Sequence, residues 1–398
     1  MFAPLEHALD VAAADLVASQ RAIATRLRIL HVVEATFAGT GRHVLDQIRG
    51  MLASGHEAHL IYSPVRMEQH FAEELASLQG LRSCAVPMQQ APSPADLAAV
   101  LAVRRYLRRH GPFDVVHGHS SKGGAIARLA AIGLGAARFY TAHAFKSMDP
   151  ALGRPARRLY GTIEAFLGRT ATDAVIAVSP EEERHAAKLG IPRDRCRCIL
   201  NAVERPARLP DRATARAMFG LGHDEFCLLF VGRLAPQKAP ERFVELVRAL
   251  APSVPGLRGL MLGYGPLEPS VRRQIETAGL AGRLRLHTDR RGWDGMAAAD
   301  LLVVTSDYEG MPYILLEAAS MGLPIVTTDV GGARLVVVPG ENGLIVPPGD
   351  AVALEAAVRA VVRDRRRFTR ARAPSWTPDD MVAATLGLYR EHYRSRGA

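Results

Sequence analysis

The stretch Asp307-Tyr-Glu-Gly-Met-Pro-Tyr-Ile-Leu-Leu-Glu-Ala-Ala-Ser-Met-Gly322 decides the fold class, because it joins a buried strand to a helix. The run Leu301-Leu-Val-Val304 before it is uniformly apolar, as expected of a parallel strand that is covered on both faces. Pro312 suits the first turn of a helix, since its missing N–H would have no partner there anyway. The segment therefore predicts a strand–helix unit of an α/β protein, with the helix beginning near residues 311–312.

Two glutamates frame this turn. Glu309 lies in the predicted loop, and Glu317 lies about two helical turns further on. A helix N-terminus at the carboxyl end of a parallel strand favours anions, because its free backbone N–H groups point at the ligand. Carboxylates are poor phosphate ligands, but they accept hydrogen bonds from sugar and ribose hydroxyls. The arrangement therefore predicts a nucleotide-sugar site.

Length and composition indicate two globular domains. The chain has 398 residues, and a single hydrophobic core stops growing at about 250–300 residues. No run of apolar residues is long enough to predict a membrane-spanning helix. Acidic residues at Glu6, Asp10 and Asp15 interrupt the early apolar positions, so residues 1–26 lack a signal-peptide layout. We expect these residues to form a helical extension.

The four cysteines are too few and too scattered for a disulfide framework: Cys84, Cys196, Cys198 and Cys227. Their spacing supports neither a zinc site nor a redox pair. The cytoplasm is therefore the expected compartment.

The net charge of +10 comes almost entirely from arginine, since the chain has only four lysines. The arginines cluster at Arg104-Arg105, Arg108-Arg109, Arg157-Arg158 and Arg365-Arg366-Arg367, with Arg363 nearby. Such clusters attract anionic lipid headgroups, nucleic acid or a diphosphate-bearing acceptor, and a solvated arginine-rich surface is the plainer alternative. No nucleic-acid-binding motif accompanies them, so we expect peripheral contact with an anionic membrane and no nucleic-acid partner.

Short β-type runs alternate with helical stretches through both halves of the chain, which predicts βαβ units and parallel sheets. The predicted strands of the first half are Leu27–Glu34, His59–Tyr62, Asp114–His117, Phe139–Ala142 and Val175–Val178. Those of the second half are Cys227–Val231, Gly259–Leu262, Leu284–His287, Leu301–Thr305 and Ile325–Thr328. We therefore expect two Rossmann-like domains, residues 27–205 and 206–375, that face each other across a cleft, followed by a helical tail over residues 376–398.

The segment 307–322 resembles the E-x7-E motif of retaining glycosyltransferases of the GT-B fold, in family 4. The following stretches, Gly322–Gly332 and Asn342–Asp350, are similar to the downstream signature of that family. The resemblance runs from about Leu27 to Asp350. It implies a GT-B protein whose first domain binds the acceptor and whose second domain binds a nucleotide diphosphate sugar. It also implies that residues 376–398 return to the first domain.

The stretch Val231–Pro240 resembles the family's G-R-L-x-x-x-K-G loop. The resemblance assigns Arg233 and Lys238 to the departing diphosphate, where preorganised positive charge stabilises the negative charge that develops. Lysine is rare in this chain, yet one stands here. Ala239 departs from the pattern, because the family often has glycine at that position.

Two pairs of glycines follow predicted strands. Gly263 and Gly265 lie in a G-x-G-P-L segment that is similar to one in the family, and we expect them to let the backbone approach the nucleotide. Gly39 and Gly41 resemble the family's glycine loop, whose backbone N–H groups would meet the donor diphosphate from the other domain. Ordinary turn chemistry explains these glycines nearly as well.

Histidines follow two strands of the first half. The sequence Tyr140-Thr-Ala-His143 resembles the family pattern in which a histidine sits near the transferred sugar. The preceding stretch, Asp114–Gly124, is similar to transferases of exopolysaccharide and capsule clusters. That likeness suggests His119, Ser121 and Lys122 as residues that face the acceptor.

The resemblance thus implies a complete site. Its catalytic residues are His143, Glu309, Arg233 and Lys238. Its donor-binding residues are Gly39, Gly41, Arg233, Lys238, Gly263, Gly265, Glu309, Gly310, Met311, Pro312 and Glu317. No Asp-x-Asp occurs, so the metal clamp of GT-A transferases is missing, and we expect no cofactor and no obligatory metal.

The expected function is retaining transfer of a sugar from a nucleotide diphosphate sugar to an acceptor. A lipid-linked saccharide of exopolysaccharide or other cell-surface polysaccharide synthesis is the expected acceptor, which would place the protein in the cytoplasm or at the inner face of the cell membrane. A nucleotide-sugar epimerase and a non-catalytic sugar-nucleotide-binding protein of the same fold remain alternatives. A phosphorylase would need a cofactor lysine, and Lys238 is the only lysine in the second half.

Overall fold

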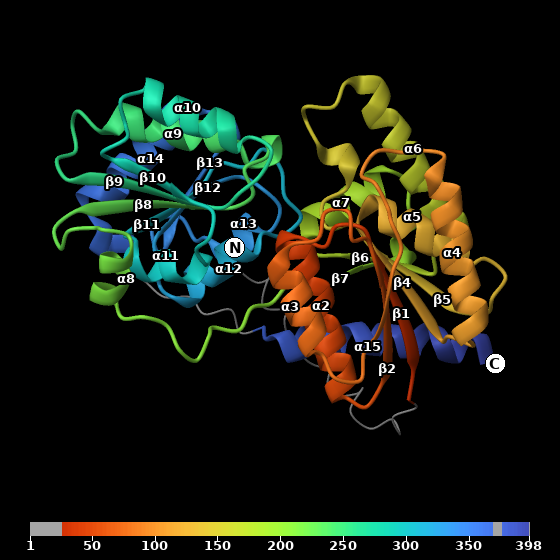
Figure 1. The fold of residues 1–398 in the computed structure, drawn as a ribbon. Coiled ribbons are helices and arrows are strands. Elements are labelled where there is room, and N and C mark those ends of the chain that lie inside the picture. The colour runs from red at the N-terminus through yellow and green to blue at the C-terminus, as the bar shows by residue number, and fades with distance from the viewer. Residues whose placement is uncertain (1–25, 369–375, 398) are drawn as a thin grey trace.

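The computed structural model describes residues 26–368 and 376–397, which form two α/β domains side by side (Figure 1). The predicted extension over residues 1–26 lies almost wholly outside the described residues. Each domain has a parallel sheet with helices on both faces. Residues 201–211 contain no helix or strand and lead from one domain into the other.

The first domain contains a seven-stranded sheet of order β3-β2-β1-β4-β5-β6-β7, in which every pairing is parallel. Its strands are β1 (Arg28–Val33), β2 (Glu57–Tyr62), β3 (Arg82–Ala85), β4 (Val115–His119), β5 (Ala137–Thr141), β6 (Ala174–Ala177) and β7 (Cys196–Cys198). Its helices are α2 (Ala38–Ala53), α3 (Gln69–Ser77), α4 (Ala95–His110), α5 (Ser120–Ala130), α6 (Arg154–Thr170) and α7 (Pro180–Lys188).

The second domain contains a six-stranded parallel sheet of order β10-β9-β8-β11-β12-β13. Its strands are β8 (Phe226–Val231), β9 (Leu257–Leu262), β10 (Leu284–His287), β11 (Leu301–Val304), β12 (Ile325–Thr328) and β13 (Gly343–Val346). Its helices are α8 (Arg212–Met218), α9 (Pro240–Leu250), α10 (Glu268–Thr277), α11 (Gly292–Ala298), α12 (Tyr313–Ser320), α13 (Ala333–Val336) and α14 (Ala351–Arg363).

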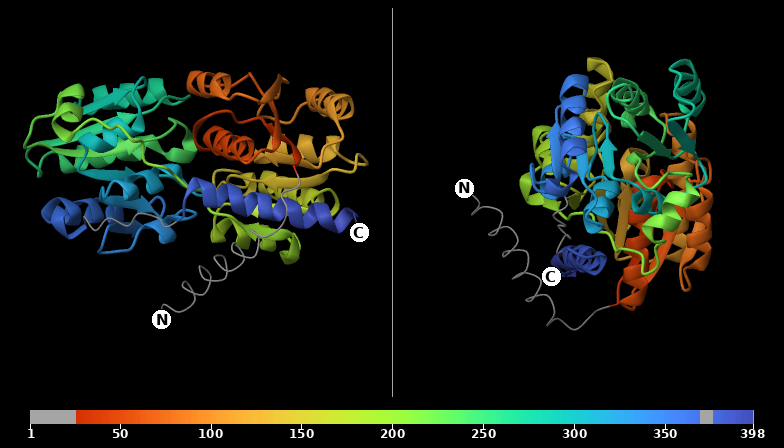
Figure 2. Two further views of the ribbon diagram at one scale, coloured as in Figure 1. Left: turned by 90° about the horizontal axis from the view of Figure 1, so that it is seen from below. Right: turned by 90° about the vertical axis from the view of Figure 1, so that its left-hand side faces the viewer.

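The last helix, α15 (Pro378–Gly397), crosses back from the second domain and packs on the first (Figure 2). Its buried side chains, among them Leu386 and Tyr389, join Ile29 of β1 and Met51 of α2 in one hydrophobic cluster. Successive side chains of a strand point to opposite faces of the sheet. Helices α2 and α15 therefore cover the face that carries Ile29, while α4 and α5 cover the face that carries Leu30.

The structure contains all ten predicted strands, with ends that differ by at most two residues. It adds β3, β7 and β13, which the pattern does not reveal. β3 has largely exposed side chains, β7 has only three residues, and β13 begins with a glycine. The helix predicted to begin near residues 311–312 begins at Tyr313. Pro312 takes an extended conformation in front of it, so the prediction that Pro312 lies in the first turn is wrong by one residue.

Two helical glycines test the docking of α15 against α2. A Cβ at Gly50 would lie 2.6 Å from a methyl group of Val382, whereas a Cβ at Gly387 would meet nothing within 4 Å. Alanine favours a helix by about 1 kcal/mol over glycine, but overpacking costs about 1–3 kcal/mol. We expect Gly50→Ala to lower the free energy of unfolding and Gly387→Ala to raise it. Urea unfolding followed by circular dichroism measures both, and equal effects would contradict this packing.

Candidate active site between the two domains

Strand order brings the predicted site residues together. In each sheet the order reverses between two neighbouring strands, β1 and β4 in the first domain and β8 and β11 in the second. Ligands of open parallel sheets bind at such points, beyond the carboxyl ends of the strands. The glycine loop follows β1, the Arg233–Lys238 loop follows β8, and Glu309 follows β11. The site thus lies where the two sets of loops face each other.

The backbone is strained at the same strand ends. Among the described residues, the non-glycine residues with positive φ all fall in segments that follow β1, β4, β5 or β8: Ala38, Ser120, His143, Ala144 and Ala239. Such conformations cost about 1–3 kcal/mol each and are typical of functional sites. Ala239 has φ +46° and is fully buried, so the residue that departs from the family's glycine sits in the conformation that favours glycine.

A cavity of about 520 Å³ opens between the domains. Phe37 and Arg66 line it from the first domain, and Arg233, Tyr264 and Thr288 line it from the second. The guanidinium groups of Arg66 and Arg233 lie 4.8 and 4.3 Å from the ring centre of Phe37. The aromatic ring favours both cations, which gives the cavity a positive wall suited to an anionic ligand.

Lys238 and Glu309 form an ion pair at the other side of the Arg233 loop. The Glu309 side chain is 8% exposed, and Gln237 also donates its side-chain amide to the backbone oxygen of Tyr308 at 3.0 Å. The hydroxyl of Thr305 donates to the backbone oxygen of Lys238 at 2.8 Å. The loops after β8 and β11 therefore hold each other, with a cation and a carboxylate side by side.

Glu317 forms an ion pair across the domain boundary with Arg42 of α2. The carboxylate is 10% exposed, and burial raises its pKa above the ordinary value while Arg42 lowers it. Arg42 also lies over the ring of Tyr313, 4.9 Å from its centre. Glu317, which is predicted to bind the ribose, is thus paired with Arg42, a residue that no sequence motif singled out.

The start of α12 fits against the first domain. The side-chain amide of Asn201 donates to the backbone oxygen of Met311 at 2.8 Å. A Cβ at Gly310 would lie 2.9 Å from the backbone nitrogen of Ala144, so glycine lets the strained turn at His143 approach this loop. The residues 310–312 therefore lie at the domain boundary, next to His143.

The predicted glycines have structural reasons of their own. A Cβ at Gly263 would meet the backbone oxygen of Gly232 at 2.0 Å, and one at Gly265 would meet that of Leu234 at 2.4 Å. Both glycines have positive φ. Close packing between the two loops therefore explains why both positions are glycine. The expected approach to a nucleotide is not needed for this explanation.

The predicted glycine loop forms the first turn of α2, and Gly39 and Gly41 are equally tightly packed there. A Cβ at Gly41 would lie 3.1 Å from the Thr36 backbone, and one at Gly39 would lie 3.1 Å from the ring of Tyr313. Gly39 therefore lets the first domain approach the start of α12.

Five buried or half-buried histidines gather behind the glycine loop: His31, His43, His117, His119 and His143. His31 pairs with His117 across β1 and β4, and the pleat puts His119 on the same face. Burial lowers the pKa of His31 to about 3 and that of His43 to about 4. It also lowers the pKa values of His117, His119 and His143 well below the ordinary value. The rings are therefore neutral at physiological pH.

The predicted acceptor residues do not present their side chains as expected. His119 is fully buried and lies between His31 and His143, at 2.9 and 3.1 Å. Lys122 is ion-paired with Asp96 and donates to a backbone oxygen. Ser121, in the first turn of α5, contributes a hydrogen bond to Tyr140. The pleat turns His119 inward, so the prediction that it faces the acceptor does not fit this structure.

Glu182 supports the strained turn. Its buried carboxylate accepts the backbone N–H of Ala144 at 2.6 Å and that of Val178 at 2.7 Å. Burial raises the pKa of Glu182 to about 7. Together with Gly310, this carboxylate fixes the backbone that carries His143 toward the second domain.

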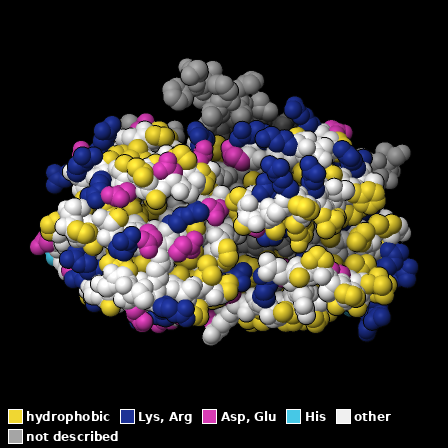
Figure 3. All heavy atoms as spheres, turned by 90° about the horizontal axis from the view of Figure 1, so that it is seen from above, with side chains coloured by type: hydrophobic (Ala, Val, Ile, Leu, Met, Phe, Trp, Pro, Cys, Tyr) yellow, Lys and Arg dark blue, Asp and Glu magenta, His cyan; other side chains and the backbone are white. Residues whose placement is uncertain are grey.

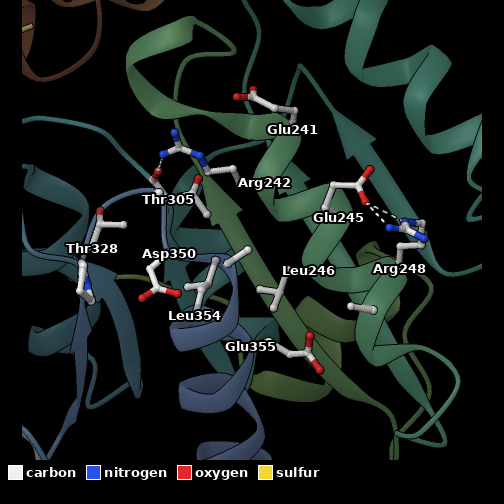
Figure 4. A pocket seen from close by; sticks show the side chains of 14 residues that line it. Glu241, Arg242, Glu245, Leu246, Arg248, Thr305, Thr328, Asp350, Leu354 and Glu355 are labelled. Atoms are coloured by element: carbon white, nitrogen blue, oxygen red, sulfur yellow. Dashed lines mark hydrogen bonds and ion pairs between the residues drawn. The ribbon is translucent and has the colours of Figure 1, made fainter. Parts of the chain in front are cut away.

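A second cavity, of about 340 Å³, lies within the second domain between α9 and α14 (Figure 4). Arg242 and Thr305 lie at one end of it, and Leu246 and Leu354 lie on its inner wall. It contains none of the predicted site residues. The interdomain cavity is therefore the better candidate for the active site.

Sequence reasoning missed Arg42, His43, Asn201 and Glu182. Arg42 and His43 directly follow the glycine loop, which was the one available signal for them. Asn201 shows its role only once the two domains are placed together, and Glu182 only once α7 is placed beside the turn after β5.

Two parallel-sheet domains with a site between the carboxyl ends of their strands define a GT-B glycosyltransferase. Two family models match the chain: Glycosyl transferases group 1 over residues 211–374, and Glycosyl transferase 4-like domain over residues 38–202. The chain belongs to this family of GT-B glycosyltransferases, family 4, and is a glycosyltransferase. The predicted fold and enzyme class are confirmed.

Named relatives support the assignment. The chain is 31% identical over 322 residues to a D-inositol 3-phosphate glycosyltransferase of Geodermatophilus obscurus, covering 73% of this chain and 71% of that protein. It is 26% identical over 280 residues to the UDP-Gal:alpha-D-GlcNAc-diphosphoundecaprenol alpha-1,3-galactosyltransferase of Escherichia coli, covering 67% and 70%. The structure of Anabaena HepE in complex with UDP and glucose has a TM-score of 0.74 at 18% identity, covering 93% and 100%.

The pair formed by Arg42 and Glu317 predicts a pH-dependent effect. Arg42→Met leaves a buried carboxylate without its cation, so we expect a loss of about 2 kcal/mol in the free energy of unfolding at pH 8, after allowance for the partly exposed arginine. The pKa of Glu317 would rise further. The folded protein would then bind a proton more readily than the unfolded chain, and the variant should regain stability as the pH falls toward 5.

Urea unfolding at both pH values measures this effect. Arg49→Met is the matched control, because Arg49 lies on the same helix and pairs with carboxylates at 48% exposure. The Arg49→Met variant should lose less than about 1 kcal/mol in the free energy of unfolding. Equal losses of stability in the two variants would contradict the pairing of Arg42 with Glu317. A loss in the Arg42 variant that does not change with pH would also contradict it.

Proposed function

We propose that this glycosyltransferase moves a sugar, with retention, from a nucleotide diphosphate sugar to an acceptor bound by the first domain. One observation carries the proposal: Lys238 of the loop after β8 pairs with Glu309 after β11, and Arg233 of the same loop reaches Phe37 of the first domain. Cations suit the departing diphosphate, and the carboxylate suits the sugar hydroxyls.

Each side chain has a chemical task in this proposal. Arg233 and Lys238 stabilise the charge that develops on the leaving diphosphate, which is worth several kcal/mol in a preorganised site. Glu309 accepts hydrogen bonds from the donor sugar and favours positive charge at the anomeric carbon. Glu317 accepts hydrogen bonds from the ribose. His143 helps to position the sugar from the first domain.

Retention would follow from attack on the same face as the leaving group. The acceptor oxygen forms the new bond to the anomeric carbon while the bond to the diphosphate breaks. A donor phosphate oxygen takes the acceptor proton, so no protein nucleophile is required. The arginine, the lysine and the helix N-terminus supply the charge for this step without an obligatory metal ion.

A thermal-shift panel tests donor binding. UDP, GDP, ADP and TDP are added separately in the presence of EDTA, and a ligand that binds only the folded state raises the melting temperature. We expect one diphosphate to raise it clearly, and the base of that ligand identifies the donor class. No shift with any diphosphate would contradict a preformed, metal-independent donor site.

Variants separate binding from chemistry. Arg233→Ala should weaken diphosphate affinity by about 10–100-fold, since it removes charge-assisted hydrogen bonds. Glu309→Ala should abolish sugar transfer, measured with a radiolabelled donor, while the diphosphate still raises the melting temperature. Arg248→Ala is the control, because Arg248 is exposed and, within residues 26–368 and 376–397, forms an ion pair with Glu245 alone. Full transfer by the Glu309 variant would contradict the assignment.

We propose a lipid-linked saccharide as the acceptor. The named galactosyltransferase of Escherichia coli acts on such a molecule, and the first domain carries a surface suited to a membrane. No helix among the described residues is long and apolar enough to cross a bilayer. Contact at the inner face of the cell membrane would therefore be peripheral.

Helices α4, α5 and α6 carry this surface. Leu159, Ile163 and Phe166 form an outward stripe on α6, at 60%, 41% and 62% exposure. The neighbouring helices α4 and α5 and the turn after α5 carry further exposed apolar residues: Leu97, Leu101, Leu129 and Ile132. Basic and hydrophobic side chains share this half of the molecule (Figure 3). Arginines beside exposed apolar side chains suit anionic headgroups and the outer acyl region.

Liposome flotation tests the surface. The protein should float with vesicles that contain phosphatidylglycerol, less so at high salt. Leu159→Ser combined with Phe166→Ser should reduce the bound fraction at least tenfold, because burying each side chain is worth about 1.5–3 kcal/mol. Val352→Ser in the second domain is the control, since Val352 is 81% exposed and lies outside the surface. Salt-insensitive binding, or no loss in the double variant, would contradict the proposal.

A further inference from the structure

The histidines behind the glycine loop show an order in their hydrogen bonds that sugar positioning does not explain. A neutral imidazole carries one N–H and one lone pair, so each ring partner decides which nitrogen keeps the proton. Two buried anchors, Asn201 and Met51, set that choice for His43 and His119. Asn201 also bonds to the backbone oxygen of Met311, one of the predicted donor-binding residues, whereas Met51 lies in the hydrophobic cluster beneath α15.

Asn201 sets His43. The amide nitrogen of Asn201 donates to the backbone oxygen of Met311 at 2.8 Å, which fixes the orientation of the amide group. Its oxygen, 3.0 Å from Nδ1 of His43, can only accept a hydrogen bond. Nδ1 of His43 therefore carries the proton, and Nε2 is left with its lone pair.

Met51 determines the tautomer of His31, and His31 in turn determines the tautomer of His119. A thioether sulfur accepts hydrogen bonds and cannot donate, so Nε2 of His31, 3.3 Å from Sδ of Met51, carries the proton. Nδ1 of His31 then accepts from Nε2 of His119 at 2.9 Å. Nδ1 of His119 is left with its lone pair, and it faces Nε2 of His143 at 3.1 Å.

Three of these histidines form one cluster. His43, His119 and His143 each offer a ring nitrogen, and the three nitrogens lie within 4.8 Å of one another. We propose that Nε2 of His43, Nδ1 of His119 and Nε2 of His143 form a binding site for a divalent transition-metal ion of the Zn²⁺ type. His143 gives up its Nε2 proton on binding and keeps one on Nδ1.

The donor set matches the chemistry of that ion. Imidazole nitrogens bind Zn²⁺ at about 2.0–2.1 Å, which puts them about 3.3 Å apart around a tetrahedral ion. Three protein ligands leave a fourth position on a tetrahedral ion. Asn201 and His31 hold the second nitrogens of two ligands, as the outer partners of metal-binding histidines usually do.

The site shares one residue, His143, with the proposed donor chemistry. Its ligands come from α2, the end of β4 and the loop after β5, all in the first domain. Arg233, Lys238, Glu309 and Glu317 belong to the second domain and take no part in it. Metal binding can therefore be present or absent whatever the outcome of the nucleotide experiments.

Equilibrium dialysis of the full chain against Zn²⁺, after treatment with a chelator, tests the proposal. Metal analysis should find one equivalent of Zn²⁺ on the wild type, and Co²⁺ should give the strong visible bands of a tetrahedral site. His43→Gln and His119→Gln should lose the ion. His223→Gln should keep it, because His223 is 97% exposed and lies far from the cluster in the second domain.

Two further variants leave all three ligands in place. Asn201→Ala and Met51→Leu remove the groups that set the tautomers, Asn201→Ala together with its bond to Met311, and each should weaken Zn²⁺ affinity by about 10–100-fold. Leucine conserves the volume of methionine, so circular dichroism should show a folded protein. No Zn²⁺ on the wild type, or equal Zn²⁺ on the wild type and the His43 and His119 variants, would overturn the proposal.

Discussion

The parallel arrangement of both sheets is the constraint on which the rest of the structure depends. In a parallel sheet every strand ends at the same edge, so all the loops that follow the strands gather there. Strand order reverses between β1 and β4 and between β8 and β11, and helix α15 ties the second domain back to the first. The edges therefore face each other. Residues as distant in sequence as Gly39 and Tyr313 come into contact for this reason.

This edge of the sheets also carries the residues whose strained backbone lowers the stability of the fold. Left-handed residues such as His143 and Ala239 cost about 1–3 kcal/mol each, against a total stability of about 5–15 kcal/mol for a typical protein. The structure supports each of them locally. Glu182 accepts the N–H of Ala144, and the hydroxyl of Thr305 donates to the backbone oxygen of Ala239 at 3.0 Å. Strain concentrated at loops that are held this firmly indicates that their shape, and not only their composition, serves the site.

The strands and the loop motifs could be predicted from the sequence, because both have local sequence patterns. Apolar runs such as Leu301–Val304 mark buried parallel strands, and Arg233, Lys238 and Glu309 stand in short motifs directly after strands. Sequence reasoning did not reach the edge strand Arg82–Ala85, whose exposed side chains carry no apolar pattern. Nor did it reach the partners that cross between domains. The pairing of Arg42 with Glu317 depends on how the domains pack, and the inward turn of His119 depends on the register of β1 and β4, which no local pattern encodes.

The carboxylates of the site show how binding and stability are linked. Glu309 and Glu317 are both nearly buried, and a buried carboxylate without a partner costs several kcal/mol. The protein itself supplies partners, Lys238 for Glu309 and Arg42 for Glu317. In the proposed donor complex, Lys238 turns to the diphosphate and both carboxylates turn to hydroxyls. Binding would then exchange ion pairs inside the protein for contacts with the donor. Because Arg42 belongs to the first domain and Glu317 to the second, that exchange also loosens one contact between the domains. Under the proposed function, donor binding and the relative position of the domains would be coupled through the same side chains.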